Sequence, residues 1–123
     1  MKSTQDLIEE ELLRVCEEGH FEACLLFNEE GIPMAGVDFS EDLNADGFAA
    51  LSVVLNQSAE LTQEFQHNAI VDEISLRISN RHRIVSRPFE VDDIKLIFIG
   101  ILPSHLPYRR ITTTIVQKVQ QLF

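Results

Sequence analysis

Residues 94–102, with the sequence IKLIFIGIL, decide the fold that this chain is expected to adopt. The segment is apolar on both faces apart from Lys95, whereas a strand with one face in water would alternate between apolar and polar residues. A strand that is buried on both faces lies inside a sheet that helices cover on each side. The segment therefore predicts a central strand between two helical layers.

Two further strands are predicted just before this segment, at residues 70–79 and 83–89. The first alternates cleanly, with polar residues on one face and three apolar residues on the other: Ile74, Leu76 and Ile78. The second is weaker, because Pro88 has no amide hydrogen and interrupts it. Turns at residues 80–82 and 91–93 separate these strands.

A hairpin is predicted nearer the start of the chain. Residues 21–27 (FEACLLF) form a short apolar run, and residues 32–37 (IPMAGV) form a second strand. The turn between them, residues 28–31, ends in Gly31, which suits a positive φ. Because Pro33 cannot donate to a strand ladder, the second strand is expected at an edge of the sheet.

Helices are predicted at both ends of the chain. The first begins at Ser3 or Thr4, has apolar residues at helical spacing with acidic residues between them, and stops at Gly19. The last runs from about Tyr108 to the end of the chain, with four apolar residues on one face: Ile111, Ile115, Val119 and Leu122.

The middle helix, residues 45–66 with Asn44 or Asp46 as its cap, has more apolar surface than one sheet can cover. Its apolar side covers about half of the circumference, whereas a helix that rests on one sheet needs a stripe of roughly 100°. This side includes Phe48, Ala50, Leu51, Val54, Leu55, Ser58, Ala59, Leu61 and Phe65. Val53 adds an apolar residue among polar neighbours, so a second protein surface is expected to cover part of this helix.

The elements follow the order α-β-β-α-β-β-β-α. We expect one α/β (α+β) domain over residues 1–123, with a five-stranded, mostly antiparallel sheet and helices on both faces. The chain shows no internal repeat or linker that would divide it.

The charge is unevenly distributed. Residues 1–73 hold 17 acidic and two basic side chains, whereas residues 74–123 hold three acidic and eight basic ones, and the net charge is −10. Such an acidic chain repels nucleic acid over most of its surface, so nucleic-acid binding is not expected. The sequence has neither an apolar signal region nor a membrane-spanning run, which predicts a cytoplasmic protein that is not bound to a membrane.

No catalytic or metal-binding motif is present in the sequence. Nucleotide-binding loops, nucleophile elbows and HExxH pairs are all missing, so we expect no enzyme activity, no cofactor and no metal. The histidines are interpreted as exposed residues of turns and junctions: His20, His67, His82 and His105. Cys16 and Cys24 lack metal-ligand spacing and are expected to be free core thiols, with a redox pair as the alternative.

A cluster of basic residues marks the hairpin around residues 77–87. It contains Arg77, Arg81, His82, Arg83 and Arg87. One interpretation is a charged strand edge that discourages aggregation. The other is a docking surface for an acidic partner, formed by Arg81, Arg83 and Arg87. In one form of this interpretation, an arginine of the cluster would enter the active site of a GTPase as an arginine finger.

The segment FEACLLFNEEGIPMAGVDF, followed by the helix FAALSVVLNQSAELTQEF, resembles the Roadblock family, which includes dynein light chains and bacterial GTPase regulators. The hallmark is a strand, an acidic turn with glycine and a second strand, here Glu29-Glu30-Gly31-Ile32-Pro33. The similarity continues to the end of the chain, and the resemblance implies a profilin-like fold.

The resemblance also implies a function. Roadblock domains pair through their middle helices and third strands. They bind or scaffold Ras-like small GTPases, usually without contributing catalytic side chains to the GTPase. It implies these interface residues: Leu51, Val53, Val54, Gln57, Glu60, Leu61, Glu64, Ile74, Leu76, Arg77 and Ile78. Two copies of Arg77 opposed across a two-fold axis would repel, which leaves the strand register open.

We therefore predict a homodimer that binds a small GTPase. Two other functions stay open: a profilin-like sensor of small molecules, which would need a roomy interior, and a purely structural adaptor subunit.

Overall fold

The computed structural model describes residues 1–40, 43–66 and 68–123, and within these residues three helices and five strands follow one another in the predicted order. The elements are α1 (Thr4–Gly19), β1 (Ala23–Asn28), β2 (Pro33–Asp38), α2 (Ala45–Phe65), β3 (Ile74–Arg77), β4 (His82–Val91), β5 (Ile94–Pro103) and α3 (Arg109–Leu122).

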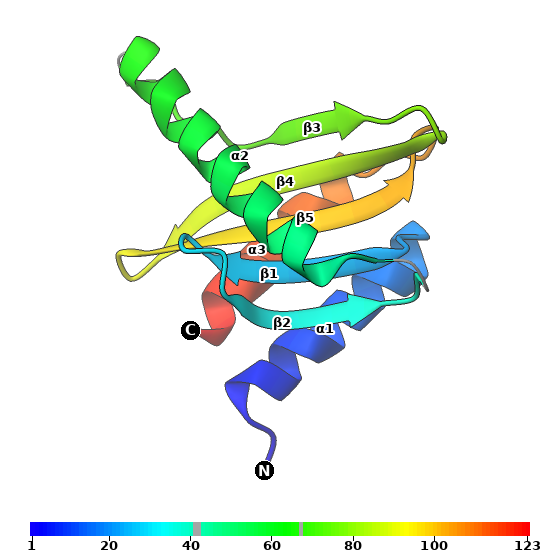
Figure 1. The fold of residues 1–123 in the computed structure, drawn as a ribbon. Coiled ribbons are helices and arrows are strands. Elements are labelled where there is room, and N and C mark those ends of the chain that lie inside the picture. Colours follow the sequence, from blue (N-terminus) through cyan, green and yellow to red (C-terminus); the bar gives the residue numbers. More distant parts are fainter. Residues whose placement is uncertain (41–42, 67) are drawn as a thin grey trace.

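The strands form one sheet in the order β2-β1-β5-β4-β3, and every pairing is antiparallel (Figure 1). The predicted central position of β5 is confirmed, since β1 and β4 flank it. The predicted edge position of β2, which carries Pro33, is confirmed as well.

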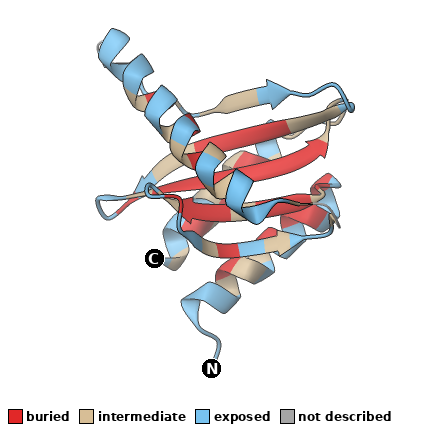
Figure 2. Ribbon diagram, in the orientation of Figure 1, coloured by how far each residue is buried: buried red, intermediate tan, exposed pale blue. Residues whose placement is uncertain are grey.

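Helices cover both faces of the sheet, as expected: α2 crosses one face, and α1 and α3 lie side by side on the other (Figure 1). Each face has its own core, and the middle strands between the two are buried along most of their length (Figure 2). Leu26, Leu96 and Phe98 face α1 and α3, whereas Phe27 and Ile97 face α2.

The ends of α1 depend on two different residues. Ser3 caps its start, with its hydroxyl accepting from the amide of Asp6 and the Asp6 carboxylate accepting from the amide of Ser3. The helix ends at Gly19, as predicted, but the left-handed conformation that follows belongs to His20, with φ 58°. Gly19 is instead needed for close packing: a Cβ there would lie 2.7 Å from the Phe21 ring.

Two strand predictions were wrong in length. The strand expected at residues 70–79 is β3, only Ile74–Arg77, and the strand expected at residues 83–89 is the longer β4. Because β3 pairs with residues 83–86, the part of β4 after residue 86 has β5 on one side and, among the described residues, no strand on the other. Pro88 lies in this open half, so it does not interrupt the strand.

The turn between β4 and β5 fixes which backbone groups of β4 face the open side. Asp92 and Asp93 both have positive φ, as in a two-residue type I′ turn, so Val91 and Ile94 form a hydrogen-bonded pair. By alternation, the backbone groups of Pro88 and Glu90 point away from β5. Pro88 has no N–H there to leave unpaired, and Gln120 of α3 donates to the carbonyl of Glu90 at 3.1 Å.

Cys16 and Cys24 are free and buried, so the prediction of core thiols is confirmed. Burial raises the pKa of the Cys24 thiol far above its ordinary range, and its hydrogen bond to Cys16 lowers the pKa of that thiol. In the part of the chain that the structure describes, no helix is both long enough and apolar enough to cross a membrane.

Candidate interaction surface

One side of α2 exposes large apolar residues to solvent. Val54 is 55% exposed, Leu61 is 65% exposed and Phe65 is 86% exposed. Their spacings of seven and four residues place them on one face of the helix, together with the exposed Ala50. This α2 stripe, Ala50, Val54, Leu61 and Phe65, confirms that the helix has more apolar surface than the sheet covers.

The face of α2 that rests on the sheet is a different one. It contains Ser52, Leu55 and Ala59, which are almost fully buried. The Ser52 hydroxyl donates to the Ala49 carbonyl at 2.7 Å, so this buried polar group is satisfied within the helix. Half-buried residues beside them, among them Phe48 and Leu51, pack against the same core.

The predicted interface residues of α2 therefore do not lie on one surface. Val54 and Leu61 are on the stripe, and Gln57 and Glu64 are exposed. Four other predicted residues are less exposed: Leu51, Val53, Glu60 and Ile74 of β3. Leu51 and Ile74 pack against the core beneath α2, and Val53 contacts the turn at Gly31. Glu60 forms an ion pair with Lys95 at 3.3 Å.

Val53 lies away from the stripe, because it packs over the turn between β1 and β2. Its Cγ2 lies 2.8 Å from the position that a Cβ on Gly31 would occupy. From the sequence, Val53 was expected to be covered by a second protein. Helical periodicity does not show which side of a helix a distant turn of the same chain approaches. Phe65, which was left out of the predicted interface set, shares the face of Val54 at a helical spacing of 11 residues.

β3 exposes a further apolar residue, on the face of the sheet that α2 crosses. Leu76 pairs with Ile84 and lies on the face of the sheet that α2 crosses, where it is 37% exposed. Ile78 follows with the same alternation and donates its amide to the carbonyl of His82 at 3.0 Å. The backbone groups of Ser75 and Arg77 consequently point away from β4, toward an outer edge that no other strand of the described residues covers.

The structure does not gather the three residues of the proposed basic docking patch on one exposed surface. Arg87 is only 7% exposed and points under α3, where its guanidinium binds Thr112 and Thr113. Arg83 is half-buried, donates to Ser75 Oγ at 3.2 Å and lies over the ring of Tyr108. Of the three predicted patch residues only Arg81 is exposed, in the turn before β4.

Solved structures share this arrangement, although neither a protein-family model nor a curated protein matches the sequence. A structure described as MglB with a tetrameric arrangement aligns over 99% of this chain and 91% of its own, with a TM-score of 0.83 and 12% identity. MglB of Myxococcus xanthus aligns over 94% and 90%, with a TM-score of 0.75 and 8% identity. A Roadblock/LC7 domain from Streptomyces avermitilis aligns over 93% and 92%, with a TM-score of 0.73 and 11% identity.

The chain has the Roadblock/LC7 fold. The resemblance that the hairpin and the middle helix suggested is therefore confirmed for the architecture. At 8% to 12% identity the likeness is one of fold.

The three described histidines, His20, His82 and His105, lie apart from one another in this Roadblock/LC7 fold. His20 ends α1 and His105 lies in the exposed loop before α3. His82 was predicted to be an exposed turn residue, but it begins β4, and its Nε2 lies 2.6 Å from Glu22 Oε1. His67 lies outside the described residues. Among the residues that are described, no group of His, Cys, Asp and Glu is arranged to hold a metal ion.

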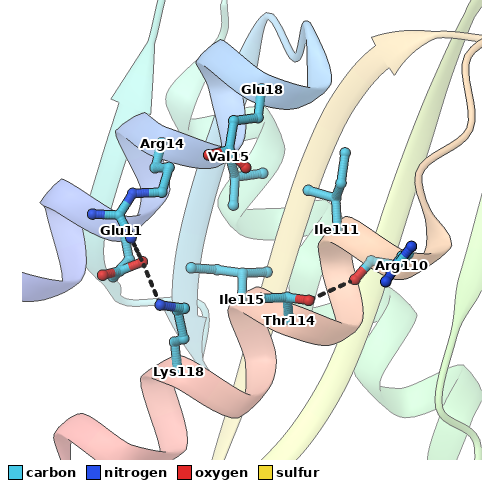
Figure 3. A pocket seen from close by; sticks show the side chains of 9 residues that line it. All are labelled: Glu11, Arg14, Val15, Glu18, Arg110, Ile111, Thr114, Ile115 and Lys118. Atoms are coloured by element: carbon cyan, nitrogen blue, oxygen red, sulfur yellow. Dashed lines mark hydrogen bonds and ion pairs between the residues drawn. The ribbon is translucent and has the colours of Figure 1, made fainter.

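A groove runs between α1 and α3 on the far side of the sheet from the α2 stripe (Figure 3). Its volume is about 380 Å³, and Val15 and Ile115 contribute apolar surface to it. Glu11 lies between two cations at its rim, 3.3 Å from Arg14 and 3.8 Å from Lys118. Glu11 therefore offsets only part of the positive charge that Arg14 and Lys118 bring to this rim.

Proposed function

We propose that this protein is a non-catalytic module that dimerises through α2 and β3 and binds a Ras-like small GTPase. The α2 stripe carries the proposal, because three large apolar side chains on one exposed helix face are unusual unless another protein covers them. The free edge of β3 and the half-exposed Leu76 adjoin the same face of the sheet.

A second copy of this chain is the occupant that fits both features. Two α2 stripes laid side by side would bury Val54 and Leu61 of each copy against those of the other, since a self-complementary patch is what a two-fold dimer requires. The four-residue β3 would then meet the β3 of the partner and extend the sheet across the dimer.

The alternation of β3 also favours one register for that pairing. If Leu76 faces Leu76 of the partner subunit across the two-fold axis, the outward backbone groups of Ser75 and Arg77 fall opposite each other in hydrogen-bonded pairs. Arg77 then meets a serine rather than a second arginine. This register removes the like-charge repulsion that a pairing centred on Arg77 would create.

The small GTPase is proposed as partner because the fold matches MglB structures and the sequence resembles Roadblock domains, whose members bind Ras-like GTPases. Cytoplasmic location and a role in signalling are proposed on the same basis. A scaffolding role fits the arrangement of the surface, in which side chains that could bind a partner are apolar rather than acid–base pairs.

Dimerisation can be tested by replacing one residue of the stripe. Leu61→Glu places a charge in the proposed contact, and we expect sedimentation at micromolar concentration to show a dimer for the natural protein and a monomer for the variant. Leu13→Glu is the matched control, because Leu13 is an exposed leucine of α1 on the opposite layer and its change should leave the dimer intact. A natural protein that sediments as a monomer would overturn the proposal.

Partner binding needs a separate experiment. Small GTPases encoded near this chain, loaded with GDP or with a non-hydrolysable GTP analogue, are passed over the immobilised protein, and their rates of GTP hydrolysis are measured in its presence. Nucleotide-dependent retention is expected. Retention with an unchanged hydrolysis rate identifies a scaffold, whereas retention of no small GTPase in either nucleotide state contradicts the proposed partner.

A further inference from the structure

The residues through which the chain reaches β3 are held by side chains of α2, β4 and α3. The Val71 amide donates to Gln63 Oε1 at 3.3 Å, and Arg87 and Arg109 bind Asp72. Residues 70–73 continue the sequence alternation of β3, but they do not pair with β4. Extended pairing would place Asp72 opposite Pro88, which has no amide hydrogen, and Gln120 already occupies the carbonyl of Glu90. Something other than a strand ladder must therefore fix this segment.

Arg87 makes the first of these attachments. Its Nε donates to the Asp72 carbonyl at 2.6 Å, and its Nη1 donates to Thr112 Oγ1 at 2.8 Å and to Thr113 Oγ1 at 3.1 Å. One guanidinium thus joins the chain before β3 to the first turns of α3. All three acceptors are neutral oxygens. Burying a cation without an opposite charge beside it costs free energy, so stability alone does not favour an arginine at this position.

Arg109 makes the second attachment, from the first residue of α3. It binds Asp72 Oδ2 at 3.0 Å and Glu73 Oε1 at 3.2 Å, and the Tyr108 hydroxyl donates to Glu73 Oε2 at 3.0 Å. Asp72 is consequently held by both its backbone and its side chain. We call this set, Arg87, Tyr108 and Arg109 with Asp72 and Glu73, the β3 clamp.

The base of the clamp is firmly placed. Thr112 and Ile115 of α3 are 0% and 1% exposed, so the start of α3 is packed into the core. β3, by contrast, has four residues, pairs on one side only, and leaves Leu76 half-exposed. Short edge strands of this kind open more readily than the core of a sheet.

We propose that Arg87 and Arg109 are positioning residues for the dimer edge: by clamping Asp72 and Glu73 to the start of α3, they set where β3 presents its outer backbone groups. The part of this inference that concerns dimer affinity rests on the proposed function. The part that concerns β3 itself does not, because the clamp lies within one chain.

The test compares Arg109→Ala and Arg87→Lys with a matched control, Arg110→Ala. Lysine keeps the charge at position 87 but lacks the fork that reaches both the Asp72 carbonyl and the threonines. Arg110 follows Arg109 in α3, and its guanidinium makes no hydrogen bond or ion pair with the residues that the structure describes. Two quantities are measured for each variant: amide hydrogen exchange along the chain, and the dimer dissociation constant from sedimentation.

We expect both clamp variants to exchange the amides of Ile74, Leu76 and Ile78, which face β4, about tenfold faster than the control, with β1 and β5 unchanged. The dimer should weaken by about the same factor. Exchange in β3 that matches the control overturns the proposal. So does an increase that is equally large in β1 and β5, because the arginines would then act only on overall stability. If Arg87→Lys does not fold, Arg109→Ala decides the matter alone.

The two proposals fail in distinguishable ways. A natural protein that is monomeric at every concentration disproves the dimer, and local exchange in β3 still decides the clamp. A dimer whose affinity and β3 exchange resist both arginine changes disproves the clamp and leaves the proposed function standing.

Discussion

Gly31 joins the first hairpin to the helix above it. Its φ is +82°, a conformation that side chains with a Cβ rarely adopt. The turn also lies so close to α2 that a Cβ there would sit 2.9 Å from the carbonyl oxygen of Ala49 and 2.8 Å from Val53. The glycine therefore lets a turn of the sheet touch helix backbone directly.

We expect Gly31→Ala to lower the free energy of unfolding by about 1–3 kcal/mol, because the new methyl group meets both a strained φ and backbone that cannot move aside. Urea unfolding measures the change. Gly36→Ala is the control: its Cβ would meet the end of the flexible Leu25 side chain, so it should cost less. Equal losses for the two variants would contradict this account of Gly31.

Among the elements, β4 has two halves with different neighbours. Residues 83–86 lie between β3 and β5, whereas the half that follows pairs, within the described part of the chain, with β5 alone. Pro88 and the hydrogen bond from Gln120 to Glu90 remove two of the backbone groups that this open half would offer to another chain. Natural sheets protect their edges in this way.

Pro88→Val tests the protection of this edge. Because the nitrogen of residue 88 points away from β5, no ladder hydrogen bond depends on it, and we expect the free energy of unfolding to change by no more than about 0.5 kcal/mol. The variant gains an unpaired N–H, so it should aggregate faster than the natural protein at the same concentration. Light scattering measures the difference. A loss of stability much larger than this, or unchanged aggregation, would count against the assigned alternation of β4.

The elements also show what the sequence could predict. Local sequence patterns were sufficient to predict the order of the elements, the burial of the central strand and the edge position of the strand that carries Pro33. Each of these features depends on residues that are close together in the chain. The first residues of the strand 70–79 were predicted wrongly, since their pairing is prevented by Pro88 and Gln120, which are distant in sequence. The burial of Arg87 could not be predicted for the same reason, because its partners Thr112 and Thr113 lie on another element.

At the scale of the whole molecule, the negative net charge affects dimerisation, because the proposed dimer brings like charges together. The net charge is −10, and α2 carries Asp46, Glu60 and Glu64 with no basic residue of its own. Two such helices side by side repel at low ionic strength, while the apolar contact that joins them is little affected by salt.

Rising salt should therefore strengthen the dimer. We expect the dissociation constant to fall by a factor of about 3 to 10 between 50 mM and 500 mM salt, as measured by sedimentation. Glu64→Gln removes one of the opposed charges and should reduce this dependence. A dimer that weakens as salt is added would instead indicate a contact held by ion pairs.

The position of β5 in the middle of the sheet has a consequence for how the chain folds as it is made. Ala23 of β1 pairs with Ile101 of β5, so the first hairpin leaves the ribosome long before the strand that will cover its inner edge. Until then the backbone groups on that inner edge of β1 have no lasting partner. Nascent chains that end before residue 94 should consequently require a chaperone, and the last 30 residues complete both cores almost at once.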